Sequence, residues 1–472
     1  MQGLIGPLKE LAEFEELCKN KKKDVGMIRV CGCVNSQKSH MMYALGDGCK
    51  YKVIACSSET KAKQIYEEYR FLDSNTYLYP AKDFLFYQAD IRSKELVKQR
   101  MEGIQAVLVG EPVTVVTSLD GFMDHLAPKE SIEGKVLEIQ NDSVLKLDEM
   151  AEKLAAVGYD REVQVEGPGQ FAVRGGILDI YPLTEELPVR IELWGDEVDS
   201  IRTFDVESQR SIENLTEITI YPAVEFPQEK EKGVSFLDYF PKEDTILFLD
   251  EPVRLVERGQ NIEDEFMEAQ KKRLESGYEL EEEEAKIFPV ADILKKINTY
   301  SSIGFFALEM KCKGLEVRES YEIQATGVNP YNNSFEMLTQ DLKRLKRNGY
   351  RVILLSGSRT RAKRLAEDLR DYNLSSYYSE DLDREVKPGE IMTAYGYIAE
   401  GYEYPMLKFT VIAESDIFGK RKKKKKRKTY EGRKIQSFSE LKPGDYVVHE
   451  NHGVGVYQGI EKIVVDKISK DY

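Results

Sequence analysis

Residues Gly32–Ser39 (GCVNSQKS) carry side chains that a phosphate-binding loop uses. They end an apolar, strand-like run and precede a predicted helix, which is the context in which the pattern G-x-x-x-x-G-K-[ST] binds nucleotides. Lys38 could place its ammonium on the terminal phosphates, and Ser39 could place its hydroxyl on magnesium. Gln37 stands where the second glycine belongs, and its side chain would crowd an approaching phosphate.

An acidic pair could complete such a site. Asp250 and Glu251 directly follow the apolar run Thr245–Leu249, as a magnesium-holding acid would. Two interpretations stay open: an ATPase that uses Lys38, Ser39 and Asp250, or a relic of a phosphate-loop fold. We favour the relic, because the missing glycine is a steric requirement of the loop.

A second group of residues favours binding rather than catalysis. In the strand-like run Val189–Trp194 (VRIELW) the two-residue period places Arg190, Glu192 and Trp194 on one polar face. Arg174, in an upstream strand, alternates toward the same surface. Arginine and tryptophan are enriched in interface hot spots, so the pattern indicates a partner-binding face. The alternative is a surface cation–π pair between Arg190 and Trp194.

The elements that must position these residues change character along the chain. Strand-like and helix-like segments alternate in the first third, which predicts a parallel α/β sheet. From about Val136, short strands separated by Gly-Gly, Pro and Gly-Asp signals predict a β-rich insertion. An α/β pattern then returns, and the glycine-punctuated run Leu441–Val465 is typical of a small β-barrel, of which the sequence covers roughly half.

The predicted fold class is therefore multidomain α/β. We expect an α/β domain with a degenerate phosphate loop, a β-rich module inserted into it, a second small α/β domain and a partial β-barrel. The expected boundaries are 1–133 and 208–326 for the interrupted domain, 134–207 for the module, 327–418 for the small domain, 419–437 for a basic linker and 438–472 for the barrel.

Charge is unevenly distributed over the 472 residues. The formal net charge is −15, yet Lys420–Lys428 (KRKKKKKRK) is a run of nine cations. Such a run could contact nucleic-acid phosphates, with an affinity that falls steeply with salt. We favour a self-repelling linker, because the aromatic residues of a nucleic-acid site are missing around it.

Composition excludes several classes of protein. No apolar run reaches the roughly 18 residues that span a bilayer, and the N-terminus lacks a signal-peptide core. The six cysteines lack regular pairing and the four histidines are scattered, so we expect free thiols and no metal site. We expect a cytoplasmic monomer without a membrane partner.

Two segments carry a resemblance to known families. Residues 169–207 (GQFAVRGGILDIYPLTEELPVRIELWGDEVDSIRTFDVE) resemble the module shared by the excision-repair protein UvrB and the bacterial transcription-repair coupling factors (the Mfd family). The later run LKPGDYVVHENHGVGVYQGIE resembles the start of the CarD-like, RNA polymerase-interacting domain of the coupling factors. UvrB lacks that domain and has an intact phosphate loop, so the resemblance favours the coupling factors. UvrB-like ATP-binding repair is the alternative.

The resemblance implies partners and site residues. In the family two arginines and an aromatic residue contact UvrA, and by motif they fall on Arg174, Arg190 and Trp194. The last is tryptophan where relatives have phenylalanine. The polymerase-interacting domain implies the polymerase β subunit as a partner, with Ile463 as the matching apolar contact.

The resemblance also implies what the full-length family does. Its members recognise RNA polymerase stalled at DNA lesions, release it by ATP-dependent translocation and recruit UvrA for nucleotide excision repair. The translocase and the C-terminal regulatory domain would follow residue 472. We therefore expect this chain to be a recruitment half with no catalytic residues and no cofactor, whose UvrA surface is unmasked. ATP and magnesium, and contact with DNA, would belong to the missing motor.

Overall fold

The computed structural model describes residues 2–82, 94–225, 231–275, 287–419 and four short strands between 446 and 471. The chain divides into two units, residues 1–420 and 421–472, and each is described by itself. Within the described residues, none of the helices combines the length and the apolar character needed to span a bilayer.

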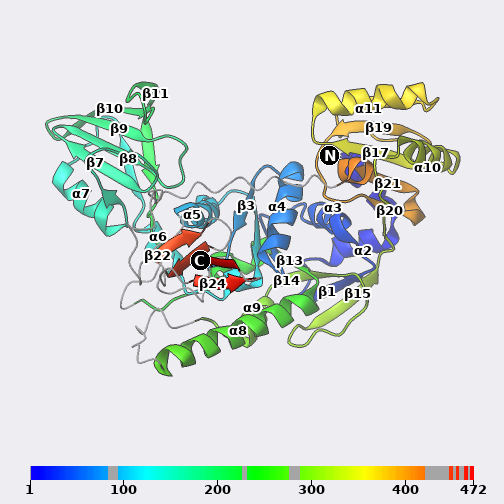
Figure 1. Ribbon diagram of the computed structural model, residues 1–472, viewed down its shortest axis with the longest axis horizontal. Coiled ribbons are helices and arrows are strands. Elements are labelled where there is room, and N and C mark those ends of the chain that lie inside the picture. Colours follow the sequence, from blue (N-terminus) through cyan, green and yellow to red (C-terminus); the bar gives the residue numbers. More distant parts are fainter. Residues whose placement is uncertain are drawn as a thin grey trace. The chain divides into compact units, whose positions relative to one another are not determined.

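The first sheet unites strands from both sides of the insertion. It has seven parallel strands in the order β15-β1-β14-β13-β2-β4-β3, so early strands lie beside late ones, blue beside green in Figure 1. Strands β13 and β4 are buried along their whole length, which explains their continuous apolar sequences. The strands are β1 (Gly26–Cys31), β2 (Tyr51–Cys56), β3 (Thr76–Tyr79), β4 (Val113–Ser118), β13 (Thr245–Asp250), β14 (Ser301–Phe306) and β15 (Val317–Glu322).

Helices connect the parallel strands of this sheet, as crossover connections require. Their apolar faces and the sheet form two clusters of buried side chains. The chain begins with short helical turns that pack into the first of these clusters. The helices are α1 (Gln2–Ile5), α2 (Ala12–Asn20), α3 (Asn35–Leu45), α4 (Glu59–Leu72), α5 (Lys94–Val109), α8 (Pro252–Glu275) and α9 (Val290–Ile297), with 3₁₀ turns at Gly6–Glu10, Leu119–Phe122, Phe236–Tyr239 and Lys242–Asp244.

The inserted module is a six-stranded sheet in the order β11-β10-β9-β8-β7-β6, antiparallel except for β6 beside β7. Helix α7 covers one face of this sheet and shares its core (Figure 1). A two-stranded ladder of β5 and β12 closes the module. The elements are α6 (Lys129–Glu133), β5 (Leu137–Gln140), α7 (Leu147–Ala156), β6 (Asp160–Arg161), β7 (Gln170–Arg174), β8 (Ile177–Tyr181), β9 (Val189–Trp194), β10 (Glu197–Phe204), β11 (Ser211–Leu215) and β12 (Glu217–Ile220).

The second α/β domain has a six-stranded sheet in the order β16-β20-β21-β17-β19-β18. Its central strands β19, β17 and β21 are parallel, and β16 and β20 add an antiparallel edge. The elements are β16 (Thr326–Gly327), α10 (Phe335–Arg347), β17 (Arg351–Ser356), α11 (Arg359–Asp371), β18 (Ser376–Ser379), β19 (Ile391–Tyr395), β20 (Tyr402–Tyr404), a 3₁₀ turn (Pro405–Leu407), β21 (Phe409–Ala413) and α12 (Glu414–Phe418).

The second unit contains two antiparallel strand pairs among its described residues. Strand β22 (Tyr446–His449) pairs with β23 (Gly453–Val456), and β24 (Lys462–Val465) pairs with β25 (Ile468–Asp471). The expected basic linker and the cations Lys420–Lys428 lie outside the described residues.

The predicted multidomain α/β architecture, with a parallel sheet and a β-rich module, is confirmed. One boundary differs from our expectation. The sheet of the module continues past residue 207, because β11 pairs with β10 and β12 returns to pair with β5. Strand β11 (SIENL) is largely exposed and lacks apolar alternation, so its sequence does not mark it as a strand, whereas β12 (EITI) does alternate.

Candidate partner-binding face and phosphate loop

The strand β9 separates an apolar face from a polar one, as its alternating sequence predicts. Val189 and Ile191 are buried in the core shared with α7. Arg190 and Glu192 are partly exposed on the other face, and Trp194 is 85% exposed. The strand register also places Arg174 on the polar face, through the neighbouring strand β8.

One buried carboxylate joins the two arginines. Arg174 Nη2 donates to Asp179 Oδ2 at 2.6 Å, and Arg190 donates to both oxygens of the same residue at 2.7 and 2.9 Å. Asp179 is 0% exposed, in the middle of β8. Charge-assisted bonds of this bidentate kind fix the orientation of a guanidinium. Arg190 is thus held by two bonds to Asp179, and Arg174 by one.

Arg190 has further contacts that restrict it. Its Nη2 also donates to Gln209 Oε1 at 3.0 Å, and its guanidinium lies over the Phe204 ring, 4.6 Å from the centroid. The stacking partner is therefore Phe204, where the sequence had suggested Trp194. The large exposed surface of Trp194 remains available, at the end of β9 beside the turn at Gly195.

Two residues of this face are missing from the sequence-based set. Asp179 is the carboxylate that organises the arginines, and Arg202 on β10 forms an ion pair with Glu192. The interruption of the apolar strand ILDIY by Asp179 is a signal that could have identified it, since an aspartate is seldom fully buried without a partner.

The polar side chains of the degenerate phosphate loop are hydrogen bonded or ion paired to other residues of the chain. Lys38 is buried and its Nζ lies 2.8 Å from Asp250 Oδ1 and 2.6 Å from Glu251 Oε1. Burial opposes the charge on Lys38, but the two carboxylates outweigh burial and raise the pKa of Lys38 above its ordinary value. The cation and the acid that a nucleotide would need are thus paired with each other.

The remaining positions of the loop are also engaged. Ser39 Oγ donates to Glu68 Oε2 at 2.6 Å, and Gln37 Nε2 donates to the Tyr404 hydroxyl at 3.0 Å. Gly32 keeps a positive φ of 80°, so the first glycine of the loop retains its special backbone conformation. A cavity beside Ser39 and Glu68 measures about 10 Å³, whereas small-molecule sites measure roughly 300–1,000 Å³.

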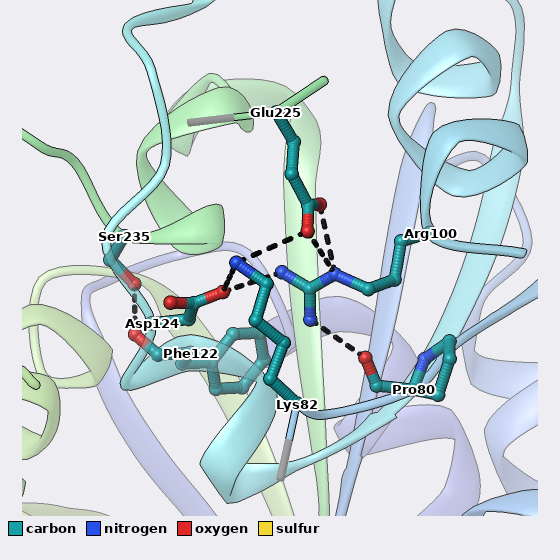
Figure 2. A network of polar contacts seen from close by, with 7 residues as sticks. All are labelled: Pro80, Lys82, Arg100, Phe122, Asp124, Glu225 and Ser235. Carbon is teal, nitrogen blue, oxygen red and sulfur yellow. Dashed lines mark hydrogen bonds and ion pairs between the residues drawn. The ribbon is translucent and has the colours of Figure 1, made fainter. Parts of the chain in front are cut away.

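A buried network lies at the base of the module, where the chain returns from it (Figure 2). We define the base network as Lys82, Arg100, Asp124 and Glu225. Arg100 is 0% exposed; its Nε donates to both Glu225 oxygens at 2.8 Å and its Nη2 donates to Asp124 at 2.8 Å. Lys82 Nζ lies 2.7 Å from Asp124 and 3.2 Å from Glu225. Two cations and two carboxylates balance in charge, which indicates a structural anchor.

The described residues contain no cluster of three His, Cys, Asp or Glu side chains suited to a metal ion. Cys33 lies in the loop region, and burial raises the pKa of its thiol to about 12. Ile463 lies in β24, opposite Lys470 in the strand register.

The module and the second unit each match a known domain family. Residues 137–226 match the UvrB interaction domain, and residues 441–472 match the CarD-like/TRCF RID domain. The matched stretch of the module includes β11 and β12, in agreement with the strand pairing. The chain thus combines a UvrB-type interaction domain with the start of an RID domain.

The chain is also similar to curated transcription-repair-coupling factors over most of its length. The chain is 29% identical to the one from Bacillus subtilis (strain 168), over 98% of this chain and 44% of that protein. It is 26% identical to the one from Staphylococcus haemolyticus (strain JCSC1435), over 84% of this chain and 39% of that protein. The chain is a homologue of the transcription-repair-coupling factors and covers their N-terminal UvrB-like and RID region.

The chain spans less than half the length of these relatives. A crystal structure of a hypothetical ATP-dependent RNA helicase from Sulfolobus tokodaii aligns with 84% of this chain and 82% of its own, at 10% identity and a TM-score of 0.25. Values this low support no inference about this chain.

Proposed function

We propose that this chain is the recruitment part of a transcription-repair coupling factor, and that Arg174, Arg190 and Trp194 form its surface for UvrA. The observation that carries the proposal is a tryptophan that is 85% exposed, on the same sheet face as two arginines that share one buried carboxylate. An exposed tryptophan offers a large apolar contact area that a partner could bury.

The geometry suits a hot spot of binding energy. Tryptophan and arginine dominate such hot spots because they combine contact area with directional hydrogen bonds. Asp179 already orders the arginine side chains, so these side chains would lose little conformational entropy when a partner binds. Arg174 and Arg202 add cationic groups near Arg190, and we expect carboxylates on the facing surface of UvrA.

The second proposed partner is RNA polymerase. The CarD-like/TRCF RID match supports binding of the polymerase β subunit by residues 438–472, with Ile463 as an apolar contact. In the whole protein we propose that polymerase stalled at a lesion is recognised through this part and released by an ATP-driven motor. UvrA is then recruited through the module, and all of these steps take place in the cytoplasm.

An ATPase of the UvrB type is the competing function. The closed phosphate loop argues against it, because Lys38 and Asp250 are paired with each other and Gln37 is bonded to Tyr404. We therefore propose that this chain has no catalytic site and needs no cofactor of its own.

The test is a binding titration of UvrA with the purified chain. Arg190→Ala should weaken binding by about 2 kcal/mol, which is about 30-fold in Kd. Trp194→Ala should act in the same direction, because it removes the largest exposed apolar surface of the face.

The matched control is Lys153→Ala. Lys153 is an exposed cation on α7, which packs on the other face of the same sheet. This variant should bind UvrA like the unaltered chain. Unchanged affinity of Arg190→Ala and Trp194→Ala would overturn the assignment.

A further inference from the structure

The degenerate phosphate loop is surrounded by the chain's own groups from two domains. One set comes from the first α/β domain, and the other from residues 399–404 of the second. We propose that this loop is a docking socket that fixes the second α/β domain, residues 327–418, to the first one without a nucleotide.

The centre of the socket is the carboxylate of Glu68 on α4, which is 1% exposed. Its Oε1 accepts from Ser36 Oγ at 2.8 Å and from Gln64 Nε2 at 3.2 Å, and its Oε2 accepts from Ser39 Oγ at 2.6 Å. The loop hydroxyls that would face a phosphate and its magnesium thus donate to an internal carboxylate. The Glu68 carboxylate accepts the hydrogen bonds that a bound phosphate would otherwise accept.

The second domain completes this hydrogen-bond set from its backbone. The amide N–H of Ala399 donates to Glu68 Oε1 at 3.2 Å, and the amide N–H of Glu400 donates to Ser36 Oγ at 3.1 Å. The Glu400 carboxylate accepts from the Asn35 side chain at the start of α3. These bonds link residues more than 300 positions apart in the chain.

Gln37 has a clear role in the same socket. Its Nε2 donates to the Tyr404 hydroxyl, while its Oε1 accepts from the amide N–H of Val34 at 3.1 Å. A glycine at this position could make neither bond. The substitution that spoils a phosphate loop is the one that supplies a contact to the second domain.

Apolar and aromatic packing surrounds these polar contacts. His40 is stacked on Tyr402 with ring centroids 5.3 Å apart, and its two ring nitrogens contact the Tyr404 hydroxyl and the Leu4 carbonyl. Burial lowers the pKa of His40 to about 4, so the ring is neutral at pH 7. One cluster of buried side chains runs through both domains. Buried polar groups that are fully bonded specify one arrangement of the elements around them.

Hydrogen exchange of the full chain, followed by mass spectrometry, tests the docking directly. In the unaltered chain the amides of Ala399 and Glu400 should exchange slowly. Glu68→Ala and Gln37→Gly should each accelerate exchange of the peptide that covers residues 396–404 by about tenfold or more, because each leaves buried partners unpaired. Glu68→Gln, which keeps the shape, should give a smaller acceleration and serves if Glu68→Ala does not fold.

The matched control is Asp73→Ala. Asp73 is another partly buried carboxylate of the first domain, and it accepts from Lys52, Thr114 and the amide of Asn75. Its removal should leave exchange at 396–404 unchanged. Equal acceleration in Asp73→Ala would mean general loosening and would overturn the proposal, as would fast exchange at 399–400 in the unaltered chain.

Titration calorimetry with ATP distinguishes the proposed docking socket from a phosphate loop that would bind ATP if its second glycine were restored. Gln37→Gly should not bind ATP, because Glu68 and the Lys38–Asp250 pair still fill the site. Binding of ATP by Gln37→Gly, with slow exchange retained at 396–404, would refute the socket. UvrA binding is not involved in either measurement, so the outcome is independent of the proposed UvrA surface.

Discussion

At the scale of single residues, a buried aspartate decides the geometry of the candidate partner-binding face. Asp179 contacts both arginines, although it has no exposed surface and cannot touch a partner itself. Its neighbours in β8 are apolar, so the carboxylate is held between the sheet core and the two guanidinium groups. A residue of this kind acts through the side chains that it orders.

Asp179→Asn should therefore weaken UvrA binding by about tenfold, because the amide loses the charge-assisted bonds that hold Arg174 and Arg190. The measurement is the same UvrA titration, with thermal unfolding recorded for each variant. Asp199→Asn, an exposed aspartate on β10 of the same sheet, is the matched control and should bind normally. Full affinity in Asp179→Asn would show that preorganised arginines are not needed.

At the scale of elements, the base network holds the segment after β12, where the chain leaves the inserted module and re-enters the first α/β domain. Glu225 follows β12, Arg100 belongs to α5, and Asp124 lies just after the 3₁₀ turn Leu119–Phe122 (Figure 2). Arg100 also donates to the Pro80 carbonyl at 2.8 Å and lies over the Tyr79 ring, 4.4 Å from its centroid. The amide N–H of Ala127 donates to the Glu225 carbonyl, so the segments that enter and leave the module are hydrogen bonded to each other there.

Glu225→Gln should lower the free energy of unfolding by about 3 kcal/mol, because it leaves the buried Arg100 without its main counter-charge. Burial alone would raise the pKa of Glu225, but Arg100 and Lys82 lower it below the ordinary value. The stabilisation is therefore present above the ordinary glutamate pKa and is lost as the pH falls through the lowered one.

Urea unfolding at pH 7 measures the effect. Glu133→Gln, which removes one partner of the more exposed Lys129–Glu133 pair, is the control and should cost under about 1 kcal/mol. Equal unfolding midpoints for the two variants would contradict an anchoring role for the base network.

At the scale of the whole molecule, the two domain families matched by the chain lie in different units. The interrupted α/β domain carries the UvrB interaction domain, and the second unit carries the RID match. The two proposed partners are therefore bound by separate units, and a change in one unit should leave the other partner's binding intact.

Ile463→Ala should weaken binding of the polymerase β subunit by roughly 1–2 kcal/mol, the usual loss for a buried aliphatic contact, and leave UvrA binding unchanged. Pull-down with each partner provides the measurement. Val464→Ala, which shortens the neighbouring aliphatic residue of the same strand, is the comparison and should bind the polymerase β subunit normally. Loss of both partners in Ile463→Ala would argue against independent units.

The sequence by itself determined the kinds of elements and the polar face of the module. Period-two alternation in Val189–Trp194 follows from strand geometry, and the exposure of Arg190 and Trp194 agrees with it. Continuous apolar runs such as Thr245–Leu249 became central strands for the same local reason. The steric argument against Gln37 in a phosphate loop also depended only on the residue type.

Only the tertiary structure decided what these residues contact. Several of the contacts described above join residues that lie far apart in the chain or on neighbouring strands, and a local sequence pattern cannot predict such pairs. They involve Asp179, Glu68, Glu225 and Tyr404. The role of a buried charge depends on the opposite charge that pairs with it, and the fold determines which residue that is. For this reason the sequence predicted a degenerate phosphate loop, while the structure showed which residues of the chain Gln37, Lys38 and Ser39 contact.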